Sequence, residues 1–152
     1  MEVLGEMQNL NPTMRQAVRI ILECAARTAL PGSVVRATVT IVAGNEAASA
    51  SGVFIDLLDS EEVALKHFST ALTEPLRISH RAMNETFRIA PPFTLAANET
   101  RIFEGKFQLP INFQPTFAGR FSRHEWQIRA RIETTNGDAD SEFQPFRVGA
   151  GF

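Results

Sequence analysis

The sequence predicts an all-β fold, an antiparallel sandwich of seven to eight strands in which each sheet buries one face. Segments rich in β-branched residues recur along the chain, apolar and polar residues alternate within them, and Gly, Pro or Asn turns separate them. The 152 residues, 44% of them apolar, suffice for one domain with a hydrophobic core. Residues 14–152 are therefore predicted to form a single sandwich domain, and residues 1–13 a flexible leader.

The first segment fits two patterns. Apolar residues fall at helical spacing from Met14 onward, and most residues in this stretch are good helix formers. The apolar residues between Val18 and Cys24 also alternate as they would in a strand. Local propensity favours the helix, so the residues alone leave both alternatives open.

The next segments predict two strands and one ambiguous stretch. Residues 33–42 alternate after a turn at Leu30-Pro31-Gly32, whereas residues 43–52 are small and polar and predict a loop. A second strand is predicted from Gly52 until Asp59-Ser60 breaks it. The residues after this break fit either a short helix with Ser60 as its N-cap or a strand over residues 63–68.

The middle of the chain predicts three further strands. Residues 75–81 and 85–90 are short strand candidates, and the second ends at Pro91-Pro92. A turn at Asn98-Glu99 precedes a half-buried strand over residues 101–109, where Phe103, Gly105, Phe107 and Leu109 share one side.

The clearest strand lies over residues 124–133. Trp126, Ile128, Ala130 and Ile132 alternate with charged and polar residues, which predicts one buried and one exposed face. Asn136-Gly137 then indicates a hairpin turn. Residues 143–148 predict the last strand, and Pro145 suggests that this strand lies at a sheet edge.

The sequence contains no recognisable catalytic or cofactor motif. Its three histidines, His67, His80 and His124, lack the spacing of metal ligands, and neither a nucleophile elbow nor a phosphate-binding loop occurs. Cys24 is the single cysteine, so no internal disulfide can form, and it follows an apolar run that predicts burial. We therefore expect a protein that is not an enzyme and that uses no metal or cofactor.

Charge and hydropathy limit the expected partners and location. A net charge of −2 does not suggest a nucleic-acid partner. No apolar run approaches the roughly 20 residues of a membrane-spanning helix, and the first residues do not resemble a signal peptide. We therefore expect a cytoplasmic protein whose partners are other proteins, and open sheet edges are compatible with a homodimer.

Arginine is the one unusual feature of the composition, with thirteen arginines against two lysines. Arginine suits planar and bidentate contacts with carboxylates or phosphorylated groups. Glutamates interrupt the arginine stripe near the clearest strand, so an ordinary mixed-charge strand surface is the alternative interpretation. The candidate partner-binding residues are Arg120, Arg123, Arg129 and Arg131.

The stretch FEGKFQLPINFQPTFAGRFSRHEWQIRARI, residues 103–132, resembles the arrestin-like fold family, which includes arrestins and bacterial sporulation-control proteins. In that family a strand ending in Phe-x-Phe/Leu-Pro leads to a Pro-Ser/Thr-Phe/Tyr-x-Gly turn and then to a strand with an aromatic and alternating basic residues. Upstream, ALPGSVVRATVTI resembles the Pro-Gly strand entry of the family, with Ala29-Leu30, Ser33 and Ala37 as departures. The matching residues are Phe107, Leu109, Pro110, Pro115, Thr116, Phe117, Gly119, Trp126 and Arg129.

The resemblance implies an immunoglobulin-like, arrestin-like sandwich of the arrestin N-terminal type. It implies that residues 17–24 form a strand, against their local helix propensity. It also implies a non-enzymatic interaction or scaffold module, whose process the fold does not name. An adhesion or cell-surface sandwich module and a carrier with a small ligand or lipid between its sheets are the alternatives.

Overall fold

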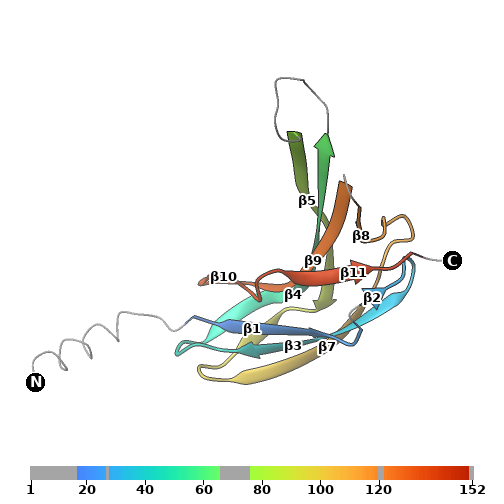
Figure 1. Ribbon diagram of the computed structural model, residues 1–152. Helices are drawn as coiled ribbons and strands as arrows, with labels where there is room; N and C mark the ends of the chain where they lie inside the picture. The colour runs from blue at the N-terminus through green and yellow to red at the C-terminus, as the bar shows by residue number, and fades with distance from the viewer. Residues whose placement is uncertain (1–16, 27, 66–75, 120–121, 151–152) are drawn as a thin grey trace, which may run out of the picture.

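The computed structural model describes residues 17–26, 28–65, 76–119 and 122–150, and the regular structure in these ranges is β-strand (Figure 1). Seven strands have five residues or more, which agrees with the predicted seven to eight, and four have two to four residues. The strands are β1 (Arg19–Cys24), β2 (Thr28–Ala29), β3 (Val34–Val42), β4 (Ala48–Leu65), β5 (Leu76–Ala90), β6 (Phe93–Leu95), β7 (Thr100–Gln108), β8 (Phe117–Ala118), β9 (Ser122–Thr134), β10 (Gly137–Asp140) and β11 (Gln144–Val148).

Two sheets form the predicted sandwich. The small sheet has the order β1-β3-β7, and the large sheet has the order β2-β11-β9-β4-β5, with β6 on β4 and with β8 and β10 on β9. The pairs are antiparallel except β2 with β11, which is parallel. Apolar side chains of the inner faces form one core between the sheets, as alternation predicted. Fully buried members include Val39, Ile41, Val53, Ile55, Leu57, Ile128 and Ile132.

The first segment is a strand, as the family resemblance implied. β1 pairs along its whole length with β3, from Arg19 opposite Val42 to Cys24 opposite Ala37. Ile20 and Leu22 are buried while Ile21 is exposed, which is the period of a strand and not of a helix. Pairing and burial therefore outweigh the weak local preference for a helix.

The boundaries predicted in the middle of the chain were wrong. β4 begins at Ala48, within the expected loop, and continues through Asp59-Ser60, where a break was predicted. The two candidates after residue 75 are one strand, β5. β4 lies between β5 and β9, whose backbones supply its hydrogen-bond partners on both sides, so polar residues are held in the strand. The predicted leader and residues 66–75 lie outside the described residues.

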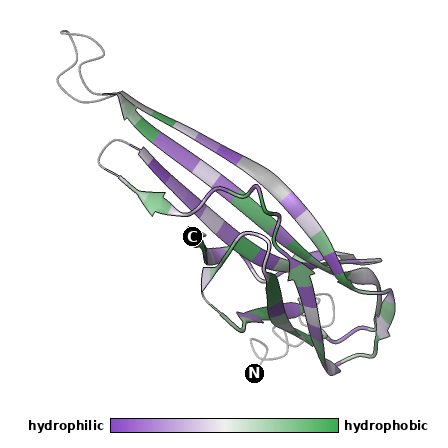
Figure 2. Cartoon of the chain, turned by 90° about the vertical axis from the view of Figure 1, so that its right-hand side faces the viewer, coloured by the Kyte–Doolittle hydropathy of each residue, from purple (hydrophilic) through white to green (hydrophobic). Residues whose placement is uncertain are grey.

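The ends of β4 and β5 project beyond the sandwich as a β-ribbon, which is at the top of Figure 1. β9 accompanies this ribbon as far as the pair Val63–Ser122. Hydrophilic and hydrophobic residues are interspersed along these strands in Figure 2. The large sheet therefore serves both as one layer of the sandwich and as a projecting arm.

The C-terminal part of the large sheet contains the predicted hairpin and the predicted last strand. Residues 135–136 form the turn between β9 and β10, so the predicted hairpin is present, with its turn one residue before the Asn136-Gly137 pair. β11 has β2 as a second neighbour only at Arg147 and Val148, whereas the part that contains Pro145 pairs with β9 alone among the described strands and lies at the sheet edge, as predicted. The two-residue strand β2 does not extend as far as Pro145. The missing N–H of Pro145 therefore removes no hydrogen bond between β11 and β2.

The segment between β7 and β9 closes one end of the sandwich over Trp126. The rings of Phe113 and Trp126 stack with centroids 4.3 Å apart, and the Trp126 indole Nε1 donates to the Gln114 carbonyl at 2.8 Å. Phe107 and Trp126 are 5% and 3% exposed, so both belong to the buried layer predicted for them. The two prolines of the segment lie in this crossing, outside the strands.

Candidate interaction surface

The arginine stripe lies on the outer face of β9, opposite the buried Trp126, Ile128, Ala130 and Ile132. Arg123, Arg129 and Arg131 lie in β9, and Arg120 lies outside the described residues. Strand alternation places these side chains on one face, as the sequence predicted. The neighbouring strand β4 adds Asp56, which the sequence did not single out.

Asp56 is 1% exposed and is the centre of the arginine stripe. Its Oδ2 accepts hydrogen bonds from Arg129 Nε and Arg131 Nε at 2.8 Å each, and its Oδ1 accepts one from Thr86 Oγ1 at 2.8 Å. Burial by itself raises the pKa of this carboxyl, but the hydrogen bonds from Arg131, Arg129 and Thr86 outweigh burial, so its pKa lies below the usual range. Asp56 is therefore an ionised carboxylate that joins β4, β5 and β9.

Each of the two arginines also lies over an aromatic ring. The guanidinium carbon of Arg129 is 4.6 Å from the centroid of Phe143, and that of Arg131 is 4.9 Å from the centroid of Phe54. Arg131 also binds Glu133, and hydrogen bonds from Arg131 to Asp56 raise the pKa of the guanidinium. Planar cations held between a carboxylate and a ring have few conformations, so this part of the face is rigid.

Arg123 does not join this cluster. It pairs with Glu62 on β4 and Glu125 on its own strand, at 3.4 and 3.3 Å. Its side chain is 50% exposed, and its position six residues from Arg129 corresponds to about 20 Å along the strand. The structure therefore brings together Arg129 and Arg131 and leaves Arg123 near the projecting arm.

Neighbouring acids neutralise much of the positive charge that the arginine stripe carries on the outer face of β9. Donors of Arg129 and Arg131 bind Asp56, Glu133 and Asp140, so this part of the stripe is a mixed-charge surface and not an open anion pocket. A signal for Asp56 was present in the sequence. It is the lone acid in the apolar stretch Gly52–Leu58. Strand alternation places it on the face opposite the core residues Val53, Ile55 and Leu57.

The two described histidines lie apart and belong to no metal-binding group. His124 is 2% exposed, with Nδ1 at 3.1 Å from the Pro115 carbonyl and Nε2 at 3.4 Å from Asp59 Oδ2. His80 lies on β5 opposite Glu61, and His67 lies outside the described residues. Within the described ranges, no group of three His, Cys, Asp or Glu side chains could hold a metal ion.

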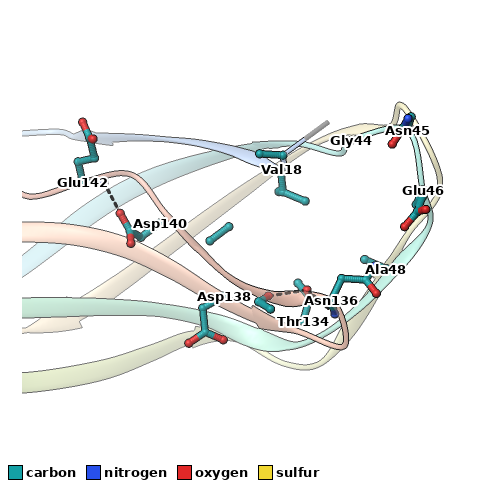
Figure 3. A pocket seen from close by; sticks show the side chains of 13 residues that line it. Val18, Gly44, Asn45, Glu46, Ala48, Thr134, Asn136, Asp138, Asp140 and Glu142 are labelled. Carbon is teal, nitrogen blue, oxygen red and sulfur yellow. Dashed lines mark hydrogen bonds between the residues drawn. The ribbon is translucent and has the colours of Figure 1, made fainter. Parts of the chain in front are cut away.

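An acidic hollow of about 390 Å³ lies between the start of β1, the β3–β4 loop and the β9–β10 hairpin. Figure 3 shows carboxylates from the loop and from the hairpin around it. Asp140 accepts a hydrogen bond from the Glu142 N–H at 2.7 Å, and Thr134 accepts one from the Asn136 N–H at 3.1 Å. The acidic residues that line the hollow are Glu46, Asp138, Asp140 and Glu142.

A second cleft, of about 530 Å³, opens between β1 and β11. Leu22, Ile128 and Phe146 form its apolar floor, and Cys24 lines its wall. Burial raises the pKa of the Cys24 thiol, as expected for a cysteine among apolar residues. The volume of this cleft lies in the range of small-ligand sites.

In the described part of the chain, no helix has the length and apolar character required to cross a bilayer.

Comparison with known proteins identifies the fold through a solved structure and not through sequence similarity. No protein-family model matches the sequence, and no curated protein matches it either. Among solved structures, the chain is similar to the sporulation control protein Spo0M of Bacillus subtilis, with a TM-score of 0.67 and 22% sequence identity. The similarity covers 90% of this chain and 51% of the Spo0M chain, so the present chain spans about half the length of that protein. The topology and this similarity together show that the chain has an arrestin-like β-sandwich fold.

Proposed function

We propose that the protein is a non-enzymatic interaction and scaffold module that binds an extended segment of a partner protein along β5. The observation that carries this proposal is the projecting arm, in which β5 is the last strand of the large sheet. A strand at the edge of a sheet offers backbone N–H and C=O groups to an added strand, which is a recurrent mode of peptide binding.

Two bulges limit the open edge to the arm. The register of β4 and β5 shifts between Val53 and Phe54 and again between Leu57 and Leu58. Bulges bend a strand and disturb the regular spacing of its backbone groups, which hinders pairing. From Asp59–Ala82 to Leu65–Leu76 the register is unbroken, so seven consecutive residues of β5 offer a regular edge.

The residues of this edge favour an acidic partner segment. Residues 76–82, LRISHRA, contain two arginines and one histidine and no acid. Ile78 is 52% exposed, and Ser79, His80 and Arg81 are exposed as well. An extended segment that places an apolar side chain opposite Ile78 and carboxylates beside the basic positions would match this edge.

Site-specific photocrosslinking in cells of the source organism tests the proposal. A photoreactive amino acid at Ser79 is expected to capture a partner through an acidic, extended segment, whereas the same amino acid at the exposed Thr94 of β6 is not. A synthetic peptide of the captured segment should then bind the purified protein. Absence of a partner specific to position 79 would overturn the proposal.

Proline substitution supplies a second, independent measurement with the captured peptide. N–H groups of successive residues in a strand point to opposite sides, so one of Ser79→Pro and His80→Pro removes an outward N–H and spares the pairing with β4. The variant that retains its circular dichroism spectrum should lose at least about tenfold in peptide affinity. Unchanged affinity in both variants would contradict strand addition.

The cleft between β1 and β11 favours a second candidate function, a carrier of a small apolar ligand. Its volume of about 530 Å³ lies in the range of ligand sites, and its floor is apolar. Native mass spectrometry of the protein purified from its source would detect a co-purifying ligand. Release of that ligand by Leu22→Arg would place it in the cleft, and an unliganded mass would remove this candidate.

A further inference from the structure

The outer face of the small sheet carries an ordered pattern of side chains. The register of β1, β3 and β7 places its outward residues in five successive rows across the strands. We call this surface the small-sheet face. Its rows are Arg19–Val42–Thr100, Ile21–Thr40–Ile102, Glu23–Thr38–Glu104, Arg36–Lys106 and Val34–Gln108.

The apolar members of this face are unusually exposed. Ile21, Val34 and Ile102 are 48%, 57% and 61% exposed, and they are three of the seven large hydrophobic residues with such exposure among the described residues. Ile21 and Ile102 flank Thr40 in one row, and Val34 lies at the end of the middle strand. These three residues therefore expose apolar surface on one sheet face, on both sides of its charged rows.

The charges of the face are segregated by row. Glu23 and Glu104 form an acidic row, and Arg36 and Lys106 form the adjacent basic row. All four residues are exposed. Within the described part of the chain, none of the four forms an ion pair within 4 Å, in contrast to the arginines of the large sheet.

We infer that the small-sheet face binds the same face of a second copy of this chain, around a two-fold axis that lies along the rows between the acidic and the basic row. Rotation about this axis reverses the strand direction and exchanges the two rows. Glu104 of each copy then faces Lys106 of the other, and each Arg36 approaches the other acidic row. The interface is isologous and self-complementary in charge.

The same operation also matches the apolar residues. The row that contains Val34 is placed over the row that contains Ile21, Thr40 and Ile102 of the second copy. Val34 then lies over Thr40 and between the two isoleucines. Face-to-face sheets pack about 10 Å apart with interdigitated side chains, so one apolar contact forms on each side of the two charged rows.

The charge pattern excludes the other in-plane axis. A two-fold axis parallel to the strands would place Glu23 over Glu104 of the second copy and would bring Arg36 near Lys106. Like charges that face each other across an interface are repulsive, so this arrangement is disfavoured. The four charged residues of the two rows therefore indicate both the partner, which is a second copy of this chain, and its orientation.

The size of the face predicts a weak dimer. Three strands at about 4.8 Å spacing and nine residues at about 3.3 Å rise give roughly 400 Å² for each copy. This is about half of the surface that each partner buries in a stable complex of standard size. We therefore expect reversible dimerisation that weakens as salt screens the charges.

Sedimentation velocity of the full chain, at concentrations from roughly 10 μM to 1 mM, tests the interface. The wild type should shift from monomer to dimer with increasing concentration, and Glu104→Lys should weaken the dimer at least about tenfold because it creates two lysine–lysine contacts. The double variant Glu104→Lys/Lys106→Glu inverts both charges in both copies and should restore dimerisation. Val34→Asp should abolish it.

The control is Asp138→Lys, an exposed charge reversal on β10 of the large sheet, which should leave dimerisation unchanged. A wild type that stays monomeric over the whole range overturns the inference. A dimer that Glu104→Lys strengthens, or that the double charge swap does not restore, also overturns it, because the proposed axis would then be wrong. Because the β5 edge is not part of the small-sheet face, the outcome is distinguishable from failure of the proposed partner binding.

Discussion

Arg131 binds Asp56 through two nitrogens across neighbouring strands, with Nε at 2.8 Å from Oδ2 and Nη2 at 3.3 Å from Oδ1. The two residues are diagonal neighbours, since the register places Arg131 opposite Phe54 and Arg129 opposite Asp56. The bond therefore crosses the ladder at an angle and joins two rows of the sheet. Together with Arg129 and Thr86 it links three strands at the base of the projecting arm.

Asp56→Asn should destabilise the protein by about 2–4 kcal/mol. The substitution leaves two partly buried guanidinium groups without their shared carboxylate, and breaking a buried ion pair from one side is strongly destabilising. Urea unfolding followed by circular dichroism would measure the loss. Asp138→Asn, at an exposed site, is the control and should change stability by less than about 0.5 kcal/mol. Equal stabilities for both variants would contradict the role given to Asp56.

Stability should depend on pH through Asp56 in acid. Its pKa is lower in the folded than in the unfolded chain, so the unfolded chain binds more protons between the two values and the free energy of unfolding increases with pH there. The contribution is fully present above the unfolded pKa of about 4 and is lost as pH falls through the folded pKa. Urea midpoints of the wild type should fall in this acidic window, and Asp56→Asn should lack this part of the slope. Parallel profiles for the two proteins would contradict the prediction.

Phe113→Ala should loosen the closing segment over Trp126. The stacked partner is lost, and large-to-small substitutions of buried phenylalanine cost about 3–5 kcal/mol. Trp126 is the single tryptophan of the chain, so its fluorescence should shift to longer wavelength as water reaches the indole. Ile111→Ala, in the same segment but 82% exposed, should leave the spectrum unchanged. A blue-shifted or unaltered spectrum in Phe113→Ala would show that the segment is held elsewhere.

Gly105→Ala should destabilise the contact between the two sheets by roughly 1–3 kcal/mol. A Cβ at Gly105 would lie 2.7 Å from Cβ and 3.0 Å from Cδ1 of Ile89, so β7 and β5 would have to separate. Ile89→Gly removes the obstructing side chain, and a double-mutant cycle should give a favourable coupling between the two substitutions. If the changes in stability of the two single variants were additive in the double variant, the Cβ at Gly105 would not clash with Ile89.

The faces of the strands were predictable because alternation is a local property of each segment. In β9, Trp126 and Ile128 face the core while Arg129 and Arg131 face outward, as their sequence spacing requires. The hairpin turn beside Asn136-Gly137 and the Pro31-Gly32 strand entry were also recognisable from local turn chemistry. The family resemblance, and not propensity, assigned β1 as a strand.

Strand lengths were not predictable in the same way. The sequence suggested a break at Asp59-Ser60 and separate strands after residue 75, yet pairing of β4 with β5 and β9 holds both polar stretches in long strands. The hydrogen-bond partners of these polar stretches are far away in the sequence, so no local sequence pattern predicts the pairing. The proposed β5 edge depends on this length and on the positions of the bulges.

Local sequence patterns and the family resemblance were sufficient to predict the sandwich, its inward and outward residues and the presence of an arginine stripe. The packing of strands that are distant in the sequence placed Asp56 beside Arg129 and Arg131, and Gly105 against Ile89. It also decided which charges stand in adjacent rows of the small-sheet face, because row membership follows from the register of three strands. Periodicity fixes which face a side chain occupies, whereas long-range pairing fixes its neighbours on that face.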